Sequence, residues 1–307
     1  MWGMRLIFDL QGHRGARGLA PENTVPGFRT ALAVGVSTLE LDAAVTRDGM
    51  VVVAHDRRLS PDITRGPDGR WLEPPTPAVY ELSVQELSRY DVGRIRPGSH
   101  YADRFPQQRA IDGLHMPRIV DVLALARLAP SVRFNIETKI SPLAPHESTS
   151  PAAFVDLLLA AITECGVEDR VTIQSFDWRS LRLVRERAPH IPTVYLTAAE
   201  YQKRDGLWTD GRELSQHGSI ARLIRAAAGP APAVWSPDHR DVTQAAIREA
   251  RALSLGVIPW TVNSDDEMDR MVDWGVTGFI TDYPDRARRV LGARGIELPP
   301  PMPSIGA

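Results

Sequence analysis

The sequence predicts an α/β protein whose core is a (β/α)8 barrel, or TIM barrel. Short apolar runs rich in β-branched residues alternate with helical patterns, which indicates a parallel sheet covered by helices. Roughly eight such units fill about 250 core residues, and this number fits a closed barrel better than a doubly wound sheet. A Gly-x-Gly-x-x-Gly motif follows none of the predicted strands, so a dinucleotide-binding sheet is disfavoured.

The first unit contains a strand over residues 5–11 and a helix over residues 24–35. Thr24 is a suitable N-cap, because its hydroxyl can accept a hydrogen bond from the first helical turn. Pro26 lies in that first turn, where a missing N–H costs nothing. Gly35 is suited to end the helix in a left-handed conformation.

The remaining units repeat this order, and a turn over residues 47–49 joins two neighbouring strands. Further strands are predicted over residues 37–45, 50–54, 132–138, 170–175, 193–196, 233–236, 257–262 and 278–281. Further helices are predicted over residues 120–128, 151–165, 177–188, 243–254, 265–274 and 284–291.

Three stretches depart from the pattern. Residues 57–116 are rich in Pro, Gly, Asp and Arg and are predicted to be an insertion between barrel units. Residues 198–232 are predicted to be irregular around a short helix, and residues 299–307 contain four prolines. We therefore expect one barrel domain over residues 1–295 and a flexible Pro-rich tail over residues 296–307.

The composition excludes several function classes. Hydrophobic residues make up 43% and charged residues 24% of the chain, so wholesale disorder is excluded. The 36 Lys and Arg nearly balance the 38 Asp and Glu, so we expect neither a nucleic-acid partner nor a broad anionic-membrane surface. The single cysteine, Cys165, allows no internal disulfide and no Cys-based zinc site.

Membrane and export segments are not indicated by the sequence. No apolar run reaches the ~20 residues that span a bilayer. The first ten residues lack an apolar core followed by a small-residue cleavage site. We expect a soluble protein that is cytoplasmic by default, with a periplasmic or secreted protein as the alternative if a leader has been removed. The sequence predicts no particular oligomeric state.

Two predicted strands carry polar side chains in the same phase. Glu40 and Asp42 share one face about 7 Å apart, because side chains alternate along a strand. Asn135, Glu137 and Lys139 share one face of a later strand. Taken alone, each set could be a solvated strand edge, but both lie at C-terminal strand ends, where barrel active sites form. Three convergent carboxylates form a hard oxygen site, so Glu40, Asp42 and Glu137 are predicted to bind Mg²⁺ or Ca²⁺.

His13 and His55 each directly follow an apolar strand. A lone strand-end histidine is more often a packing or capping residue. Two of them beside possible metal ligands indicate an acid/base pair, because histidine exchanges protons near neutral pH. Arg14 is next to His13 and could bind an anionic oxygen. The other histidines, at positions 100, 115, 146, 190, 217 and 239, lie mostly in predicted loops and are assigned no role.

These residues belong to an ordered set of motifs that resembles the glycerophosphodiester phosphodiesterase family. The motifs are Gly12-His13-Arg14-Gly15-Ala16, Pro21-Glu22-Asn23-Thr24, Glu40-Leu41-Asp42, Asp48 to Asp56, Asn135-Ile136-Glu137-Thr138-Lys139, Ile173-Gln174-Ser175-Phe176, Pro259-Trp260-Thr261-Val262-Asn263 and Gly278 to Pro284. The resemblance runs from about residue 7 to residue 290, and the order of eight motifs makes it specific.

The resemblance implies a (β/α)8 barrel with a small insertion after the second barrel strand, where residues 57–116 lie. It also implies a divalent metal, Mg²⁺ or Ca²⁺, on the three carboxylates, with His13 and His55 as acid and base. The positions that match substrate contacts are Arg14, Lys139, Gln174 and Trp260.

The implied reaction is the metal-dependent hydrolysis of glycerophosphodiesters to sn-glycerol 3-phosphate and an alcohol. In the family, the neighbouring glycerol hydroxyl is thought to attack first, giving a cyclic phosphate that water then opens. One alternative is a lysophospholipase D-type enzyme, which needs an apolar groove. Candidates for its lining are Trp71, Tyr80, Trp208 and Trp235, although aromatic residues in such irregular stretches more often anchor loops. Another alternative is an inactive barrel that binds an anion, although a binding protein needs no proton donor.

Overall fold

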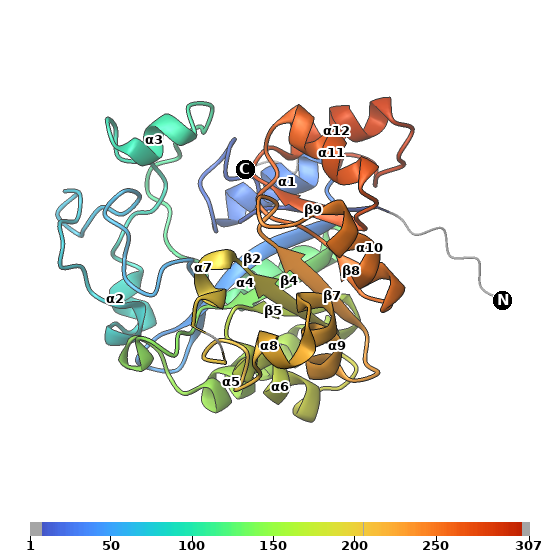
Figure 1. Ribbon diagram of the computed structural model, residues 1–307. Coiled ribbons are helices and arrows are strands. Elements are labelled where there is room, and N and C mark those ends of the chain that lie inside the picture. The colour runs from blue at the N-terminus through green and yellow to red at the C-terminus, as the bar shows by residue number, and fades with distance from the viewer. Residues whose placement is uncertain (1–7, 205, 303–307) are drawn as a thin grey trace.

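The computed structural model describes residues 8–204 and 206–302. Its core is a nearly closed barrel of eight parallel strands surrounded by helices, as Figure 1 shows, and the predicted fold class is confirmed. The barrel strands are β1 (Asp9–Gly12), β2 (Thr38–Val45), β4 (Arg133–Thr138), β5 (Val171–Ser175), β6 (Thr193–Thr197), β7 (Ala233–Pro237), β8 (Gly256–Val257) and β9 (Gly278–Thr281). For the first predicted strand, residues 5–7 lie outside the described residues.

The barrel closes between the last two strands through extended backbone that continues beyond β8. The N–H of Thr277 donates to the carbonyl of Val257, and the N–H of Ile280 donates to that of Pro259, both at 2.9 Å. The prediction of a strand over residues 257–262 was therefore wrong in length. Pro259 has no N–H and cannot continue a regular ladder, so the segment pairs only at intervals.

Helices cover the outside of the barrel. The longer ones are α1 (Val25–Val34), α5 (Pro151–Cys165), α6 (Trp178–Arg187), α9 (Ile220–Ala228), α10 (Gln244–Ala252), α11 (Asp265–Asp273) and α12 (Pro284–Ala293). The short ones are α2 (Val84–Leu87), α3 (His100–Arg104), α4 (Ile119–Leu123), α7 (Ala199–Gln202) and α8 (Leu214–His217). On β2, Leu39 and Leu41 are fully buried in the hydrophobic core beneath these helices, so the intervening carboxylates face the barrel interior.

Two predicted segments differ from the structure. The helix predicted over residues 120–128 is α4 followed by a 3-10 turn at Ala124–Arg127, a common way for a helix to end. Residues 198–232 contain α7, α8 and α9 rather than one short helix. Ser219 caps α9, whose buried face holds residues spaced at a helical period, including Ala221, Ile224 and Ala228.

The insertion lies beside the barrel mouth, at the left of Figure 1, and carries α2 and α3. It begins after β3 (Val51–Val53), which pairs antiparallel with the end of β2. Val52 packs with Leu59 and Leu87 in a small hydrophobic cluster. A second cluster joins Phe105 of the insertion to Tyr283, which follows β9. The insertion is therefore attached to the barrel on two sides of the mouth.

Thr24 caps α1 as predicted and gives a stability test. Its hydroxyl accepts a hydrogen bond from the N–H of Gly27 (3.1 Å) and donates one to the carbonyl of Pro21 (2.6 Å). We expect Thr24→Ala to lower the free energy of unfolding in urea by about 1–2 kcal/mol. The matched control is Thr30→Ala on the same helix, whose hydroxyl only bonds back to a helix carbonyl and whose loss should cost less. Equal losses in the two variants would contradict the capping role.

The C-terminal segment contacts the barrel as far as it is described. The N–H of Met302 donates to the carbonyl of Leu32 (3.1 Å), and the Arg288 guanidinium donates to that of Pro299 (2.6 Å). Residues 303–307 of the predicted tail lie outside the described residues. Among the residues that the structure describes, no helix is both long and apolar enough to cross a membrane.

Candidate active site

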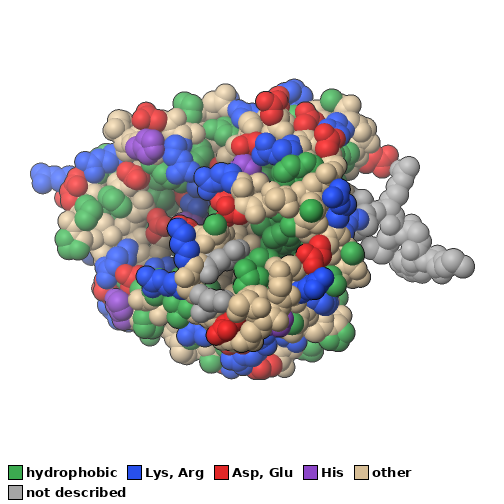
Figure 2. All heavy atoms as spheres, viewed as in Figure 1, with side chains coloured by type: hydrophobic (Ala, Val, Ile, Leu, Met, Phe, Trp, Pro, Cys, Tyr) green, Lys and Arg blue, Asp and Glu red, His purple; other side chains and the backbone are tan. Residues whose placement is uncertain are grey.

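A cavity of about 720 Å³ opens at the C-terminal ends of the barrel strands, beside the insertion. Figure 2 shows a hollow in this face with several Lys and Arg side chains along its border. Of the predicted site residues, the cavity is lined by His13, Arg14, Glu40, His55, Glu137, Lys139, Gln174 and Trp260. Asp42, the remaining one, is buried behind Glu137 and Lys139. The structure thus brings all nine predicted residues to one place.

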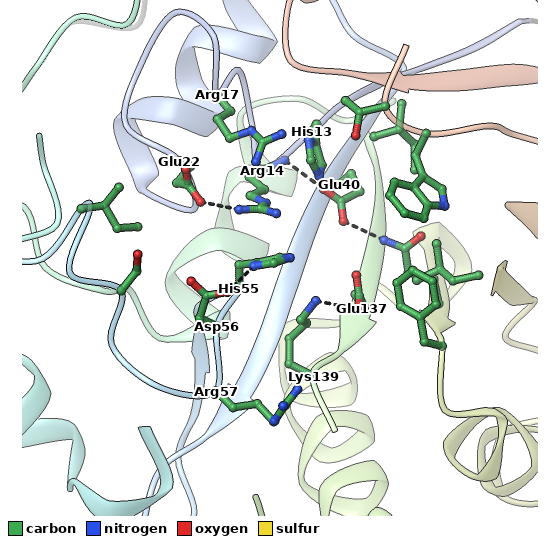
Figure 3. A pocket seen from close by; sticks show the side chains of 18 of the residues that line it. His13, Arg14, Arg17, Glu22, Glu40, His55, Asp56, Arg57, Glu137 and Lys139 are labelled. Carbon is green, nitrogen blue, oxygen red and sulfur yellow. Dashed lines mark hydrogen bonds and ion pairs between the residues drawn. The ribbon is translucent and has the colours of Figure 1, made fainter. Parts of the chain in front are cut away.

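Glu40, Asp42 and Glu137 converge because β2 and β4 are neighbours in register, with Asp42 opposite Glu137. Each offers one oxygen to a set in which all the oxygens lie within 4.8 Å of one another. All three side chains are buried, with 1%, 1% and 8% of the residue surface exposed, respectively. In Figure 3, Glu40 and Glu137 point into the same cavity.

The three carboxylates are buried close together and repel one another. Burial, and then the charge of Asp42, raise the pKa of Glu40 well above its usual range. Burial raises the pKa of Glu137 to about 7, although Lys139 opposes this shift. Burial also acts to raise the pKa of Asp42. The interactions of this carboxylate with His55 and Lys139 outweigh burial and hold its pKa well below the usual range. The site therefore favours the arrival of additional positive charge.

The donor set fits a divalent cation. Asp42 Oδ1 is buried and has no hydrogen-bond partner among the described residues, which is costly for a carboxylate oxygen unless another group contacts it. The two oxygens of Glu40 are held in place, one by the side-chain amide of Gln174 (2.7 Å) and the other by the N–H of Arg14 (2.9 Å). Oxygen ligands of this kind suit Mg²⁺ or Ca²⁺.

His13 is oriented by Asp282. Its Nδ1 lies 2.7 Å from Asp282 Oδ1, and because a carboxylate only accepts, this nitrogen carries the hydrogen. The other nitrogen, Nε2, is left free toward the cavity and lies 3.9 Å from Glu40 Oε2. Burial and the neighbouring Arg17 lower the pKa of His13 to about 4, although Asp282 opposes this shift. The ring is therefore neutral at pH 7 and able to take up a proton at Nε2.

His55 has a similar arrangement and lines the same cavity. Its Nδ1 lies 2.7 Å from Asp56 Oδ1, which again leaves Nε2 for the cavity. A third of its side chain is exposed, so it is more open to solvent than His13. Burial, then Arg14 and Lys139, place the pKa of His55 below its usual range. Figure 3 shows the two rings on opposite sides of Arg14.

The two cations predicted to bind phosphate lie at the carboxylates. Lys139 Nζ is 2.7 Å from Glu137 Oε1 and 3.7 Å from Asp42 Oδ1. The guanidinium of Arg14 lies 3.4 Å from Asp42 Oδ2 through Nε, donates to Glu22 Oε1 at 2.5 Å and is nearly as buried as the carboxylates. Both cations are therefore close enough to the metal-ligand set to contact an anion bound there.

Gln174 belongs to a polar layer of the barrel interior beneath the cavity. Its amide donates to Glu40, and its carbonyl oxygen accepts from Asn135 (2.9 Å). Asn135 also donates to Gln11 (2.9 Å). The position predicted to contact substrate is thus engaged with the protein, and Gln174 holds Glu40 in its orientation.

Trp260 forms the aromatic wall of the cavity. Its ring packs edge-on against Phe176 at 5.6 Å between centroids, and Phe176 packs against Tyr201 at 4.4 Å. The aromatic residues considered as candidates for a lysophospholipid groove lie outside the lining of this cavity. Trp71, Tyr80, Trp208 and Trp235 are all among the described residues, and none of them lines the cavity.

Asp282, Arg17 and Tyr101 are functional candidates that the sequence reasoning missed. Asp282 lies directly after β9, at the kind of strand end that singled out His13, so the same rule would have selected it. Arg17 holds Asp282 through two hydrogen bonds, of 2.7 and 3.0 Å. Tyr101 reaches this group from the insertion, and no sequence pattern connects it to the barrel.

Comparisons with known proteins show the family to which the chain is similar. A model of the glycerophosphoryl diester phosphodiesterase family matches residues 13–286. The chain is similar to a glycerophosphodiester phosphodiesterase of Bacillus subtilis (strain 168), which is 31% identical over 282 residues that cover 91% of this chain and 84% of the relative. A crystal structure from Silicibacter pomeroyi DSS-3, provisionally assigned to the same family, has a TM-score of 0.86 and 35% identity and covers 96% of each chain. A phosphodiesterase of Oleispira antarctica, solved with the product sn-glycerol-3-phosphate, shares the fold at a TM-score of 0.67 and 19% identity, over 93% of this chain and 97% of that one.

Proposed function

This chain belongs to the glycerophosphoryl diester phosphodiesterase family, and on that premise we propose that it hydrolyses glycerophosphodiesters to sn-glycerol 3-phosphate and an alcohol, using a divalent metal and two histidines. One observation carries the proposal. Three buried carboxylates cluster at the cavity that two histidines line, one carboxylate oxygen has no hydrogen-bond partner among the described residues, and the Nδ1 of each histidine is held by an aspartate. A site that only bound an anion would need neither the free Nε2 atoms nor their orientation.

Glu40, Asp42 and Glu137 are the proposed metal ligands. A divalent cation bound there would offset their charge and polarise a non-bridging phosphate oxygen, an effect worth several kcal/mol. Arg14 and Lys139 add two positive charges beside the same site, so the negatively charged phosphodiester is attracted rather than repelled. Trp260 and its aromatic neighbours form the wall against which the apolar parts of the substrate lie.

His13 and His55 are the proposed proton-transfer residues. One, in its neutral form, takes the proton from the glycerol hydroxyl next to the ester as that oxygen attacks phosphorus, and the other, protonated at Nε2 when the anionic substrate is bound, gives that proton to the departing alcohol oxygen. The P–O bond to the alcohol breaks, and a cyclic glycerol phosphate is left for water to open with the two roles reversed. Proton transfer of this kind contributes ~10²–10⁴-fold to a rate.

Removal of divalent ions tests this proposal. We expect protein treated with EDTA to release no sn-glycerol 3-phosphate from glycerophosphocholine or glycerophosphoethanolamine above the uncatalysed rate. Turnover should return on addition of Mg²⁺ or Ca²⁺, because the three carboxylates alone repel the substrate. Product release is measured by a coupled assay in the three conditions.

Lysophosphatidylcholine, assayed in parallel, tests the lysophospholipase alternative. Faster turnover of this lipid than of its deacylated counterpart would favour that alternative. No turnover of any glycerophosphodiester with either ion would overturn the proposed activity, and equal turnover in EDTA would overturn the role of the metal.

A further inference from the structure

Tyr101 of the insertion lies between two buried guanidinium–carboxylate pairs of the barrel. Its hydroxyl donates a short hydrogen bond to Glu22 Oε2 and accepts one from Arg17 Nη1 at 3.2 Å. Glu22 and Arg17 are each only 5% exposed, so water has little access to either partner. Burial and the charge of Glu22 raise the pKa of Tyr101, which keeps the phenol protonated as a donor.

One arm of this network leads to His13. Arg17 donates to both oxygens of Asp282, and Asp282 Oδ1 also accepts from His13 Nδ1 at 2.7 Å. Asp282 is fully buried, and Arg17 holds the carboxylate that orients the histidine. The Tyr101 hydroxyl occupies the Nη1 side of Arg17, which the bidentate contact leaves free.

The other arm leads to Arg14. Glu22 Oε1 accepts from Arg14 Nη1 at 2.5 Å, while Glu22 Oε2 accepts from Tyr101. Arg14 Nε has no hydrogen-bond partner among the described residues and lies 3.4 Å from Asp42 Oδ2, so Glu22 and Asp42 together constrain this guanidinium, Glu22 through the shorter contact. The backbone of Arg14, in the left-handed region at φ 51°, donates to Glu40. Figure 3 shows Arg17, Glu22, Arg14 and His13 side by side at the edge of the cavity.

The insertion holds Tyr101 in place. The tyrosine ring packs against Phe105 at 5.0 Å between centroids, and the Arg17 guanidinium lies 4.5 Å from the centre of the Phe105 ring. The amide of Gln108 donates to the carbonyl of Arg17 at 2.8 Å. These contacts fasten the insertion to the loop after β1 that carries His13, Arg14 and Arg17.

We propose that Tyr101 is a positioning residue whose hydroxyl joins the His13–Asp282–Arg17 group to the Glu22–Arg14 group. Docking of the insertion thereby orients His13 for proton transfer and Arg14 for phosphate binding. The inference rests on the proposed function, since it takes Arg14 and His13 as the groups that act on a phosphodiester. Loss of the hydroxyl would leave Glu22 Oε2 buried without this partner, which disfavours the rotamer that holds Arg14. The insertion is thereby part of the active site and not only a cover over it.

The alternative is that Tyr101 only fastens the insertion. Tyr283 provides the matched control, because its hydroxyl donates to the carbonyl of Arg104 (3.2 Å) and belongs to the same cluster as Phe105. It ties the insertion to the barrel without contacting Arg17, Glu22 or Arg14 through its hydroxyl. Tyr283→Phe therefore removes a docking contact and leaves the network intact.

The experiment compares Tyr101→Phe, Tyr283→Phe, Glu22→Gln and the double variant Tyr101→Phe/Glu22→Gln with the wild type in Mg²⁺. The readouts are the Kd for sn-glycerol 3-phosphate by calorimetry, kcat/KM for glycerophosphoethanolamine, and the Tm. We expect Tyr101→Phe to weaken product binding and to lower kcat/KM by ~10-fold or more, since the hydroxyl contacts a charged group. Tyr283→Phe should change the Kd and kcat/KM by less than ~2-fold each, even if its Tm falls by as much as the Tm of Tyr101→Phe.

The double variant gives a second criterion. The hydroxyl reaches Arg14 through Glu22, so the loss of Tyr101 should have little further effect on the Kd for sn-glycerol 3-phosphate once Glu22 is neutral. Additive effects on this Kd, an unchanged Tyr101→Phe, or an equal loss in Tyr283→Phe would overturn the inference. If the wild type binds sn-glycerol 3-phosphate but hydrolyses no glycerophosphodiester, the proposed activity fails, while the binding data still decide whether Tyr101 orients Arg14.

Discussion

Replacement of His13 by alanine is expected to lower kcat/KM for a glycerophosphodiester by at least ~100-fold. The contacts of the His13 imidazole fix both its orientation and its tautomer. Nδ1 is held by Asp282, and Nε2 is directed to the cavity near Glu40. General acid or base groups of this kind contribute ~10²–10⁴-fold. Initial rates are measured with glycerophosphoethanolamine and saturating Mg²⁺, over a substrate range that separates kcat from KM.

Two further variants show whether the loss is specific. His190 is exposed and precedes β6, at the opposite end of the barrel, so His190→Ala should leave the rate unchanged. Asp282→Asn keeps an oxygen near His13 but removes the charge that fixes the Nδ1–H tautomer, and we expect a loss of ~10-fold or more. A His13→Ala variant with a folded CD spectrum and a wild-type rate would exclude the proposed proton transfer.

The barrel could be predicted from the sequence because its signals are local. Each strand and most helices are marked by the period of their own residues and by caps such as Thr24 and Gly35. The segment over residues 257–262 was predicted too long, because its pairing depends on carbonyls of β7 and β9 that the segment itself does not encode. The helix α9 was not separated from its surroundings, although Ser219 and the apolar spacing behind it mark its start.

The metal-ligand set could be predicted for a similar reason. Strand alternation places Glu40 and Asp42 on one face, and the register of adjacent parallel strands then brings Glu137 opposite Asp42. The hydrogen bonds of Tyr101 could not be predicted from the sequence, because they join positions that no helix or strand period relates. Tyr101 and Glu22 are 79 residues apart, and only the packing of the insertion on the barrel brings them together.

Glu137→Gln is expected to stabilise the metal-free protein at neutral pH and to abolish its response to metal. In the folded, metal-free chain the pKa of Glu137 is raised from 4.5 to about 7, so ionising this group disfavours the folded state. The contribution of this group to the stability of the wild type should therefore fall as the pH rises from about 4.5 to about 7. Glutamine can still accept from Lys139 but carries no charge, so the variant should be the more stable at pH 8 by an amount on the order of 1–3 kcal/mol, and equal at pH 4.

Added Mg²⁺ should reverse this order. Binding to the folded state stabilises the wild type by RT ln(1 + [L]/Kd), about 4.1 kcal/mol at 1,000 times the Kd, whereas a site with two carboxylates gains little. Hydrolysis by the variant should fall at least ~100-fold, because the substrate loses the cation that offsets its charge. Urea unfolding in EDTA and in Mg²⁺, at pH 4 and pH 8, measures the free energy of unfolding of each protein in the four conditions.

Glu147→Gln is the matched control, because we expect it to change the free energy of unfolding at pH 8 in the opposite direction. Glu147 lines the same cavity but bridges Arg57 (3.0 Å) and Arg58 (2.7 Å). Burial opposes the shift, but these two guanidinium groups lower the pKa of Glu147, so its charge stabilises the folded state above the pH at which it ionises. Its neutral variant should be less stable than the wild type at pH 8 and should still respond to Mg²⁺. A Glu137→Gln variant that behaves in the same way would show that Glu137 is a structural ion-pair partner of Lys139 and that the metal lies elsewhere.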